Sequence, residues 1–462
     1  MNKIFYYLLV FTLIKFTISD EKDKFGFIFL HDEKSPYDNN FLEAAKEVCD
    51  ELEVEPIFKT NIPETEECYN TAKELVESGC KGVFADSFGH EEHILKAAKE
   101  FNETQFGHAT GTLAHTNNLT NFHNAFASIY EGRYVTGIAA GMKLKEMIDN
   151  GDIKESEAKV GYVGAFPYSE VISGYTAFYL GVKSIVDSAV LKVRYTNSWY
   201  DEKLEKEAAE KLIDEDKCKI ISQHADSQGA PNACESKGVP NVFYNGENTA
   251  LNNSYLISSR INWRPYFRYF INSTKNNNTM DPDWTGSLED GSVEVYNASS
   301  LAAEGTQDAV DKAIDDLKKK NIKVFDTSKF TVDGKTLTTY KADVDSDEKF
   351  EGDTEAISDG YFHESEYRSA PYFDVIIDGV EIEEEEVTDE PKKDSPNNQQ
   401  RYYTNKKKKG LSGGKIAAII VPIVAIIGIV LALIMFSRSS SNKPIFDPTG
   451  SNSNLSVKNS SP

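Results

Sequence analysis

The chain has 462 residues, of which 40% are hydrophobic and 27% are charged, a composition typical of a globular protein long enough for two or three domains. It carries 50 basic against 74 acidic residues, so its formal net charge is -24. A surface this acidic repels phosphate backbones, which argues against a nucleic acid as a partner.

The first residues are typical of a secretory signal peptide. After Lys3, residues 1–19 hold a short apolar stretch that ends in the small residues Thr17 and Ser19. Lys15 interrupts this stretch, but the order of charged, apolar and small residues predicts cleavage near Ser19. The residues that follow are then expected outside the cell or in the lumen of an internal membrane.

Strand-like and helix-like segments alternate from residue 24 onward. The segments FGFIFLHD, VEPIFKT, KGVFADS and TQFGHATG are typical of strands, and amphipathic helical segments such as NNFLEAAKEVCDEL lie between them. After the polar turn NGDIKESE the order starts again with KVGYVGAF, LKVRYTNS, CKIISQHA, VPNVFYN and SYLISSRI. Repeated strand–helix order predicts parallel sheets with helices on both faces.

We therefore expect an α/β fold in which residues 20–380 form two Rossmann-like, doubly wound lobes joined by a hinge. Lobe one takes about 20–150 plus a later return segment, and lobe two takes about 158–262.

The composition changes after residue 380. Residues 381–414 are charged and almost free of apolar side chains, so they predict a disordered stalk. We expect a transmembrane helix at 415–436, because residues 416–436 carry no charge and a helix of this length spans roughly 30 Å. A cytoplasmic tail follows at 437–462. The chain is then a type I, single-pass protein of the plasma membrane or an endomembrane, although more Lys and Arg precede the span than follow it, against the usual bias.

Two further features agree with export. The chain has five cysteines, and in an oxidising compartment Cys218 and Cys234 are candidates for a disulfide bond, while the odd count leaves one thiol over. It also has six N-glycosylation sequons before the predicted span. Their asparagines are Asn102, Asn118, Asn252, Asn272, Asn277 and Asn297.

Motifs for catalysis are missing from the sequence. HEEH at 90–93 lacks the spacing of a zinc signature, and GLSGGK at 410–415 lacks the glycine spacing of a phosphate loop. No G-x-S-x-G nucleophile motif occurs. We expect no enzymatic activity, no cofactor and no metal.

Aromatic and polar residues recur at the predicted carboxyl ends of strands in both lobes. In doubly wound folds this edge faces the ligand crevice, and a flat heterocycle needs ring faces beside it and hydrogen-bonding groups at its edge. A lone aromatic at such a position more often packs between elements, so the prediction depends on the recurrence. The residues concerned are Tyr37, Phe41 and Phe88 in lobe one and Phe166, Trp199, Asp226 and Asn245 in lobe two.

Several longer segments resemble a known family. YEGRYVTGIAAG, GYVGAFPYSEVISGYTAFYLG and QHADSQGAP are similar to motifs of the basic membrane protein family, the purine nucleoside- and nucleobase-binding proteins of bacterial ABC transporters. The resemblance covers about residues 24–380. It implies a type I periplasmic-binding-protein fold with three crossovers between the lobes, in which hinge closure traps the ligand.

The same resemblance implies roles for particular residues. The family's two stacking aromatics fall on Phe41 or Tyr37 and on Trp199. Its acidic ligand position falls on Asn245 and its lysine on Asn262, and these two departures favour a free base over a nucleoside. The chain also lacks the lipid-bearing cysteine of the bacterial proteins, whose anchor the predicted span would replace.

Together these observations predict a membrane-anchored binding protein for a purine nucleobase or nucleoside, stacked between aromatics of two closing lobes. It would feed uptake or signalling through a transporter or signalling partner. The alternative is the ectodomain of a surface receptor or adhesin that keeps the fold without binding a small ligand.

Overall fold

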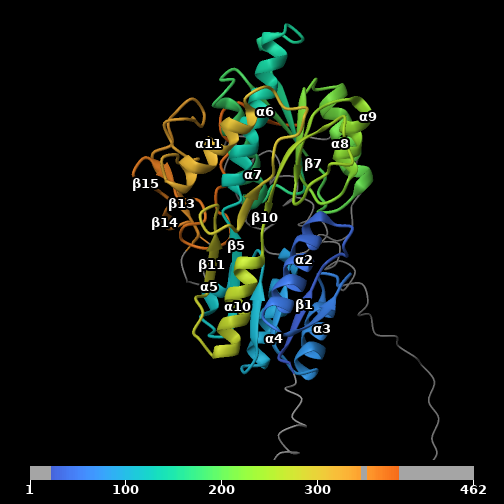
Figure 1. Cartoon of the computed structure of the whole chain (residues 1–462). Helices are drawn as coiled ribbons and strands as arrows, with labels where there is room; N and C mark the ends of the chain where they lie inside the picture. Colours follow the sequence, from blue (N-terminus) through green and yellow to red (C-terminus); the bar gives the residue numbers. More distant parts are fainter. Residues whose placement is uncertain (1–21, 345–350, 384–462) are drawn as a thin grey trace, which may run out of the picture. The chain divides into compact units, whose positions relative to one another are not determined.

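The computed structural model describes residues 22–344 and 351–383 (Figure 1). The predicted signal peptide, transmembrane helix and tail lie outside these residues, as does nearly all of the predicted stalk. Within the described ranges, none of the helices combines the length and the apolar character that crossing a membrane requires.

Lobe one is built on a six-stranded sheet with the order β11-β5-β4-β3-β1-β2, in which all neighbours are parallel. The strands are β1 (Lys24–Ile28), β2 (Glu55–Lys59), β3 (Cys80–Ala85), β4 (Gln105–His108), β5 (Phe122–Ala127) and β11 (Asp283–Gly286). The helices are α2 (Pro36–Glu51), α3 (Glu66–Glu77), α4 (Glu91–Glu100), α5 (Leu113–Asn117) and α10 (Arg264–Asn276), with the 3-10 turn η1 (Phe88–His90).

Lobe two is built on a seven-stranded sheet with the order β12-β10-β9-β8-β6-β7-β17, parallel except where β12 pairs with β10. The strands are β6 (Lys159–Gly164), β7 (Val190–Tyr195), β8 (Ile220–His224), β9 (Asn241–Tyr244), β10 (Tyr255–Ile261), β12 (Val293–Val295) and β17 (Val380–Ile382). The helices are α6 (Tyr130–Asp149), α7 (Ser169–Lys183), α8 (Glu202–Asp214), α9 (Gly229–Lys237) and α11 (Thr306–Lys318), with the turn η2 (Glu155–Glu157).

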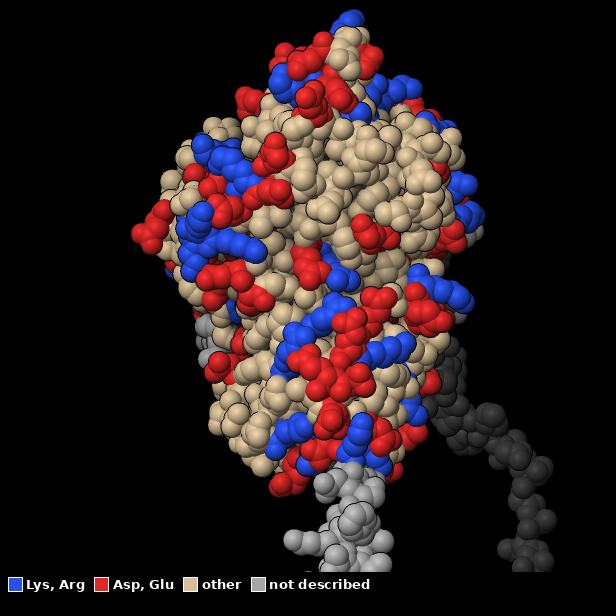
Figure 2. Space-filling view, viewed as in Figure 1, with Lys and Arg blue, Asp and Glu red and all other residues tan. Residues whose placement is uncertain are grey.

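The chain passes between the two lobes three times within the described residues: after β5, after β10 and between β11 and β12. The helix α10, yellow in Figure 1, consequently lies among the blue elements of lobe one, where it packs against α2 and β3. Ion pairs between Arg264 and Glu47 and between Arg268 and Glu51 join α10 to α2, and Figure 2 shows mixed red and blue side chains over this face.

The first crossing comes earlier than the predicted end of lobe one at about 150. The chain leaves lobe one at Ser128, because α6 packs along α7 of lobe two. Gly137 makes this close approach feasible, since a Cβ there would lie 2.1 Å from the carbonyl oxygen of Phe178. Sequence periodicity identified the helix, but the partner helix that buries it decides its lobe.

Local sequence accounts for where the main helices begin. Ser35 caps α2, accepting a hydrogen bond from the backbone N–H of Asp38, and Pro36 occupies the first turn, where a missing N–H costs nothing. The carboxylate of Asp201 accepts from two backbone N–H groups at the start of α8. These caps set where α2 and α8 begin, and therefore where the loops after β1 and β7 end.

A segment after α11 wraps lobe two before the last described strand. It contains the short ladders β13 (Lys341–Ala342) with β14 (Thr354–Glu355) and β15 (Ile357–Ser358) with β16 (Tyr361–Phe362). It ends in β17, which pairs with β7.

Part of this segment, residues 363–369, contacts both lobes, and we call it the strap. The strap residue Glu364 accepts a hydrogen bond of 2.5 Å from the Ser173 hydroxyl of α7. The backbone N–H and hydroxyl of Ser369 donate to one carboxylate oxygen of Asp283 in β11, at 2.8 and 2.6 Å. The strap therefore links the lobes in addition to the three crossings.

The predicted disulfide bond is not formed in this structure, in which all five cysteines are buried free thiols. Cys218 and Cys234 belong to one apolar cluster of lobe two, where burial raises the pKa of Cys218 to about 12. Both side chains fill space within this core, where the sequence alone suggested a covalent link. The six sequon asparagines, in contrast, are all exposed.

Candidate functional site

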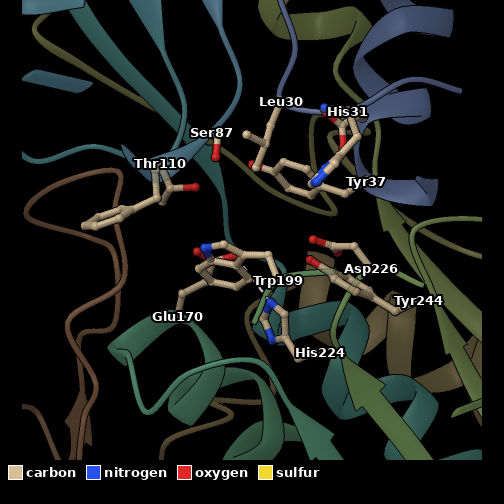
Figure 3. A pocket seen from close by; sticks show the side chains of 12 residues that line it. Leu30, His31, Tyr37, Ser87, Thr110, Glu170, Trp199, His224, Asp226 and Tyr244 are labelled. Carbon is tan, nitrogen blue, oxygen red and sulfur yellow. Dashed lines mark hydrogen bonds and ion pairs between the residues drawn. The ribbon is translucent and has the colours of Figure 1, made fainter. Parts of the chain in front are cut away.

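A cavity of about 410 Å³, including its opening to solvent, lies between the lobes (Figure 3). Both lobes supply its lining. Lobe one contributes Leu30, His31, Tyr37, Asp38, Ser87, Phe88 and Thr110, and lobe two contributes Glu170, Trp199, His224, Asp226 and Tyr244.

The topology explains this lining. In each sheet the parallel strands end at the same edge, and the residues that immediately follow them face the crevice. Thus Leu30 follows β1, Ser87 follows β3 and Thr110 follows β4, while His224 and Tyr244 are the last residues of β8 and β9. The remaining members come from loops or from the first turns of helices α2 and α7.

Four of the residues expected from the sequence line the cavity: Tyr37, Phe88, Trp199 and Asp226. Figure 3 shows the Trp199 ring between the side of lobe one that holds Tyr37 and the side of lobe two that holds His224. The backbone carbonyl of Trp199 accepts a hydrogen bond of 2.8 Å from the backbone N–H of Asp226. This bond joins the loop after β7 to the loop after β8.

Phe166 lies one layer behind the cavity. Its ring stacks on Tyr168, with centroids 5.0 Å apart, and meets Trp199 edge-on at 5.3 Å. It supports the indole without lining the space that a ligand would fill.

Three other expected residues lie elsewhere. Phe41 is fully buried and stacks on Trp263, with ring centroids 4.2 Å apart, so it belongs to the core of lobe one. Asn245 is buried, and its side-chain oxygen accepts a hydrogen bond from Asn40 of lobe one at 3.2 Å. The side-chain amide of Asn262 donates to the Gly291 carbonyl oxygen at 3.0 Å, at the crossing after β10.

Sequence reasoning missed several lining residues, among them His31, Asp38 and Glu170. Asp38 and Glu170 lie in the first turns of α2 and α7, where an acidic residue is ordinary because it interacts favourably with the helix N-terminus. The missed signal was their position in the first turns of the helices that follow strands β1 and β6, at the same edge as the aromatic residues.

On the lobe-one wall, Asp38 forms a hydrogen-bonded carboxylate site. It accepts from the His31 backbone N–H at 2.7 Å and from the Ser35 hydroxyl at 2.5 Å. Burial opposes ionisation, but hydrogen bonds from His31 and Ser35 hold the pKa of Asp38 below its usual value. Behind it, burial and the nearby charge of Asp38 raise the pKa of Asp86 well above its usual value.

On the lobe-two wall, burial raises the pKa of Asp226 well above its usual value, and the charges of Asp38 and Glu205 add to this effect. These effects favour the protonated form of Asp226. Burial also lowers the pKa of His224, so its neutral ring donates from Nε2 to Glu170 at 3.3 Å. The hydroxyl of Tyr244 is buried without a hydrogen-bond partner among the described residues.

This arrangement suits a planar ligand that carries both donors and acceptors. Aromatic rings from Tyr37, Phe88 and Trp199 provide apolar walls, while Asp226 and Tyr244 provide hydrogen-bonding groups. Within residues 22–344 and 351–383, no cluster of three or more His, Cys, Asp or Glu residues has the geometry to hold a metal ion.

Two parallel α/β lobes, three crossings and a lined cavity between the lobes define a two-lobed solute-binding protein of the periplasmic-binding-protein fold. The structure resembles that of an ABC transporter solute-binding protein from Conexibacter woesei, with a TM-score of 0.54 and 17% identity, over 65% of this chain and 98% of that one. At this identity the likeness concerns the fold alone.

The family follows from the sequence match. The family described as "ABC transporter substrate-binding protein PnrA-like" (Bmp) matches residues 29–327, and this chain belongs to it. It is a family of solute-binding proteins of the ABC transporter type. The strap lies beyond the matched residues.

Two curated relatives are similar over part of the chain. A purine-binding protein of Brucella abortus is 34% identical over 226 residues, which are 48% of this chain and 59% of the relative. A candidate ABC transporter glucose-binding protein of Haloferax volcanii is 33% identical over 216 residues, 45% of this chain and 50% of the relative. The chain thus spans between half and three-fifths of the lengths of these relatives.

Proposed function

We propose that this protein binds a purine nucleobase or nucleoside in the cavity between its lobes. The observation that carries the proposal is the combination, in one cavity, of the Trp199 indole with two buried hydrogen-bonding side chains, Asp226 and Tyr244. The Tyr244 hydroxyl has no hydrogen-bond partner among the described residues. Unpaired buried polar groups are costly, and a ligand that pairs with them regains that free energy. The similarity to a purine-binding relative supports the same ligand class.

A free base fits this cavity better than a nucleoside. The family's acidic and lysine positions correspond here to Asn245 and Asn262, and neither lines the cavity. The side-chain oxygen of Asn245 accepts from Asn40, and the side-chain amide of Asn262 donates to Gly291. The positions that would hold a ribose therefore lie outside the cavity, whereas the stacking and edge contacts for a base remain. Stacking contributes about 1–3 kcal/mol per base, and the hydrogen bonds provide discrimination.

The proposal is tested by calorimetric titration of the purified full-length protein with adenine, guanine, hypoxanthine and their nucleosides. D-Glucose belongs in the panel because of the Haloferax relative. We expect a base to bind more tightly than its nucleoside, with quenching of tryptophan fluorescence. An absence of heat and of thermal stabilisation for every purine would reject the proposal and favour the receptor or adhesin alternative.

We further propose that the ligand-binding lobes lie on the extracellular or luminal side of a membrane, glycosylated at exposed sequons and anchored by the predicted span at 415–436. The exposure of all six sequon asparagines supports this topology. Treatment of the cell-derived protein with an endoglycosidase, with and without prior permeabilisation of the membrane, tests it. A mobility unchanged by the enzyme under both conditions would contradict glycosylation.

A further inference from the structure

Arg133 lies behind the cavity, in a buried environment that is unusual for a charged side chain. It belongs to the second turn of α6, just after the first crossing between the lobes, and its side chain is fully buried. Its Nη1 donates to the Gln223 carbonyl oxygen at 2.9 Å, while Nε and Nη2 have no hydrogen-bond partner among the residues that the structure describes. In the described part of the chain, no carboxylate forms an ion pair with it. Burying such a charge has a large desolvation cost, so a compensating interaction is required.

The aromatic ring of Tyr244 supplies that interaction. The guanidinium carbon of Arg133 lies 3.4 Å from the centre of the Tyr244 ring, within the range of a strong, desolvated cation–π contact. A second tyrosine, Tyr162, lies on another side with its ring centre 5.7 Å away. Both contacts are inside lobe two, so Arg133 holds Tyr244 in place whether or not the lobes are closed.

Tyr244 is the member of this group that reaches the ligand cavity. It lines the cavity, and in Figure 3 its ring runs toward the middle of the space, beside Asp226. Its hydroxyl is buried, and nothing in the described part of the chain forms a hydrogen bond with it. Burial raises the pKa of Tyr244; the charge of Arg133 opposes that rise, and Glu170 and Asp226 add to it. The contact with Arg133 therefore favours donation by the O–H group.

We propose that Arg133 is a positioning residue for ligand recognition: it fixes the Tyr244 ring by the cation–π contact and polarises its hydroxyl, so that lobe two offers a strong donor to an acceptor atom of the bound base. This inference rests on the proposed function and extends it, because it names the chemistry of one ligand edge. The ligand presents a carbonyl oxygen or an unprotonated ring nitrogen toward lobe two. The neutral state of His224, which the charge of Arg133 helps to maintain, leaves Glu170 as an acceptor on the same wall.

A double-mutant cycle on the full-length protein tests the inference, with hypoxanthine and adenine as the probes. Arg133→Met removes the charge at similar length, Tyr244→Phe removes the hydroxyl, and the third variant combines both changes. If Arg133 acts through the hydroxyl, each single variant binds the probe about 10-fold more weakly, and the double variant is no weaker than the weaker single one. A double variant whose loss is the product of the two single losses overturns the inference.

Arg133→Lys separates positioning from packing. It keeps the charge near the ring but loses the flat guanidinium stack, so we expect its affinity to lie between those of the wild type and Arg133→Met. Affinities are compared well below the unfolding temperature of the least stable variant. If Arg133 serves only to fill the core, affinities stay at the wild-type value while unfolding temperatures fall, and the inference is wrong. If the wild type binds neither probe nor any other purine, the proposed function fails first.

Discussion

Replacement of Trp199 by alanine tests the central feature of the cavity. Trp199 is half-buried, lines the cavity, and touches Phe166 and Tyr168 with ring centroids 5.3 and 6.0 Å apart. Removing the indole takes away one stacking face, worth about 1–3 kcal/mol, which corresponds to roughly 5- to 150-fold weaker binding of a base. Because the side chain is only half-buried, the loss of stability stays below the roughly 3–5 kcal/mol of a fully buried tryptophan.

Trp284→Ala is the matched control for this experiment. Trp284 is also half-buried, packs against Tyr266 with ring centroids 5.2 Å apart, and lies in β11 outside the cavity. Both variants should lose stability, but only Trp199→Ala should lose affinity in calorimetric titration. Ligand-dependent quenching should also disappear with Trp199, since the other two tryptophans of the chain do not line the cavity. Equal affinities of Trp199→Ala and the wild type for a base that the wild type binds would refute the reasoning.

Three further predictions concern stability. Phe41→Ala should lower the free energy of unfolding by about 3–5 kcal/mol in denaturant titration, because Phe41 fills the core against Trp263; a loss below about 1 kcal/mol would contradict this placement. Ser369→Ala removes the hydroxyl hydrogen bond from the strap to the Asp283 carboxylate but keeps the one from the backbone N–H, and it should lower the free energy of unfolding by about 1–3 kcal/mol in the same assay. An unchanged free energy of unfolding would mean that this hydroxyl contact does not stabilise the fold. Burial raises the pKa of Glu364 from 4.5 to about 7, so its contribution to stability is complete below the lower value and is lost as the pH rises through the upper one. Glu364→Gln should therefore flatten the fall in unfolding temperature between these two pH values, and an unchanged pH profile would argue against the buried carboxyl.

Sequence periodicity was sufficient for the architecture of the two lobes. Parallel strands buried on both faces must be apolar along their whole length, and the helices that cover them must be amphipathic, so both leave readable patterns. The carboxyl-terminal strand edge follows from the same order, which is why the sequence predicts Tyr37, Phe88, Trp199 and Asp226 near a crevice, and all four line the cavity.

Among the aromatic residues predicted at that edge, the sequence did not distinguish those that line the cavity from those that belong to the core. Tyr37 and Phe41 lie one turn apart on α2, and both are aromatic, yet the first lines the cavity and the second stacks on Trp263, the residue that precedes α10. The difference arises because α10 returns from lobe two to pack on α2, a contact between segments far apart in the chain. No local sequence pattern indicates which face of α2 will be covered by α10.

The sequence by itself determined the strand–helix order, the family and the edge at which a ligand would bind, because these depend on the periodic burial of residues close together in the chain. Only the tertiary structure decided that α6 belongs to lobe two, that Cys218 and Cys234 remain apart as core thiols, and that Arg133 lies behind Tyr244. Each of these depends on which segments far apart in the chain come into contact. Such contacts are determined by the combined packing of many side chains, and no short segment of sequence specifies them.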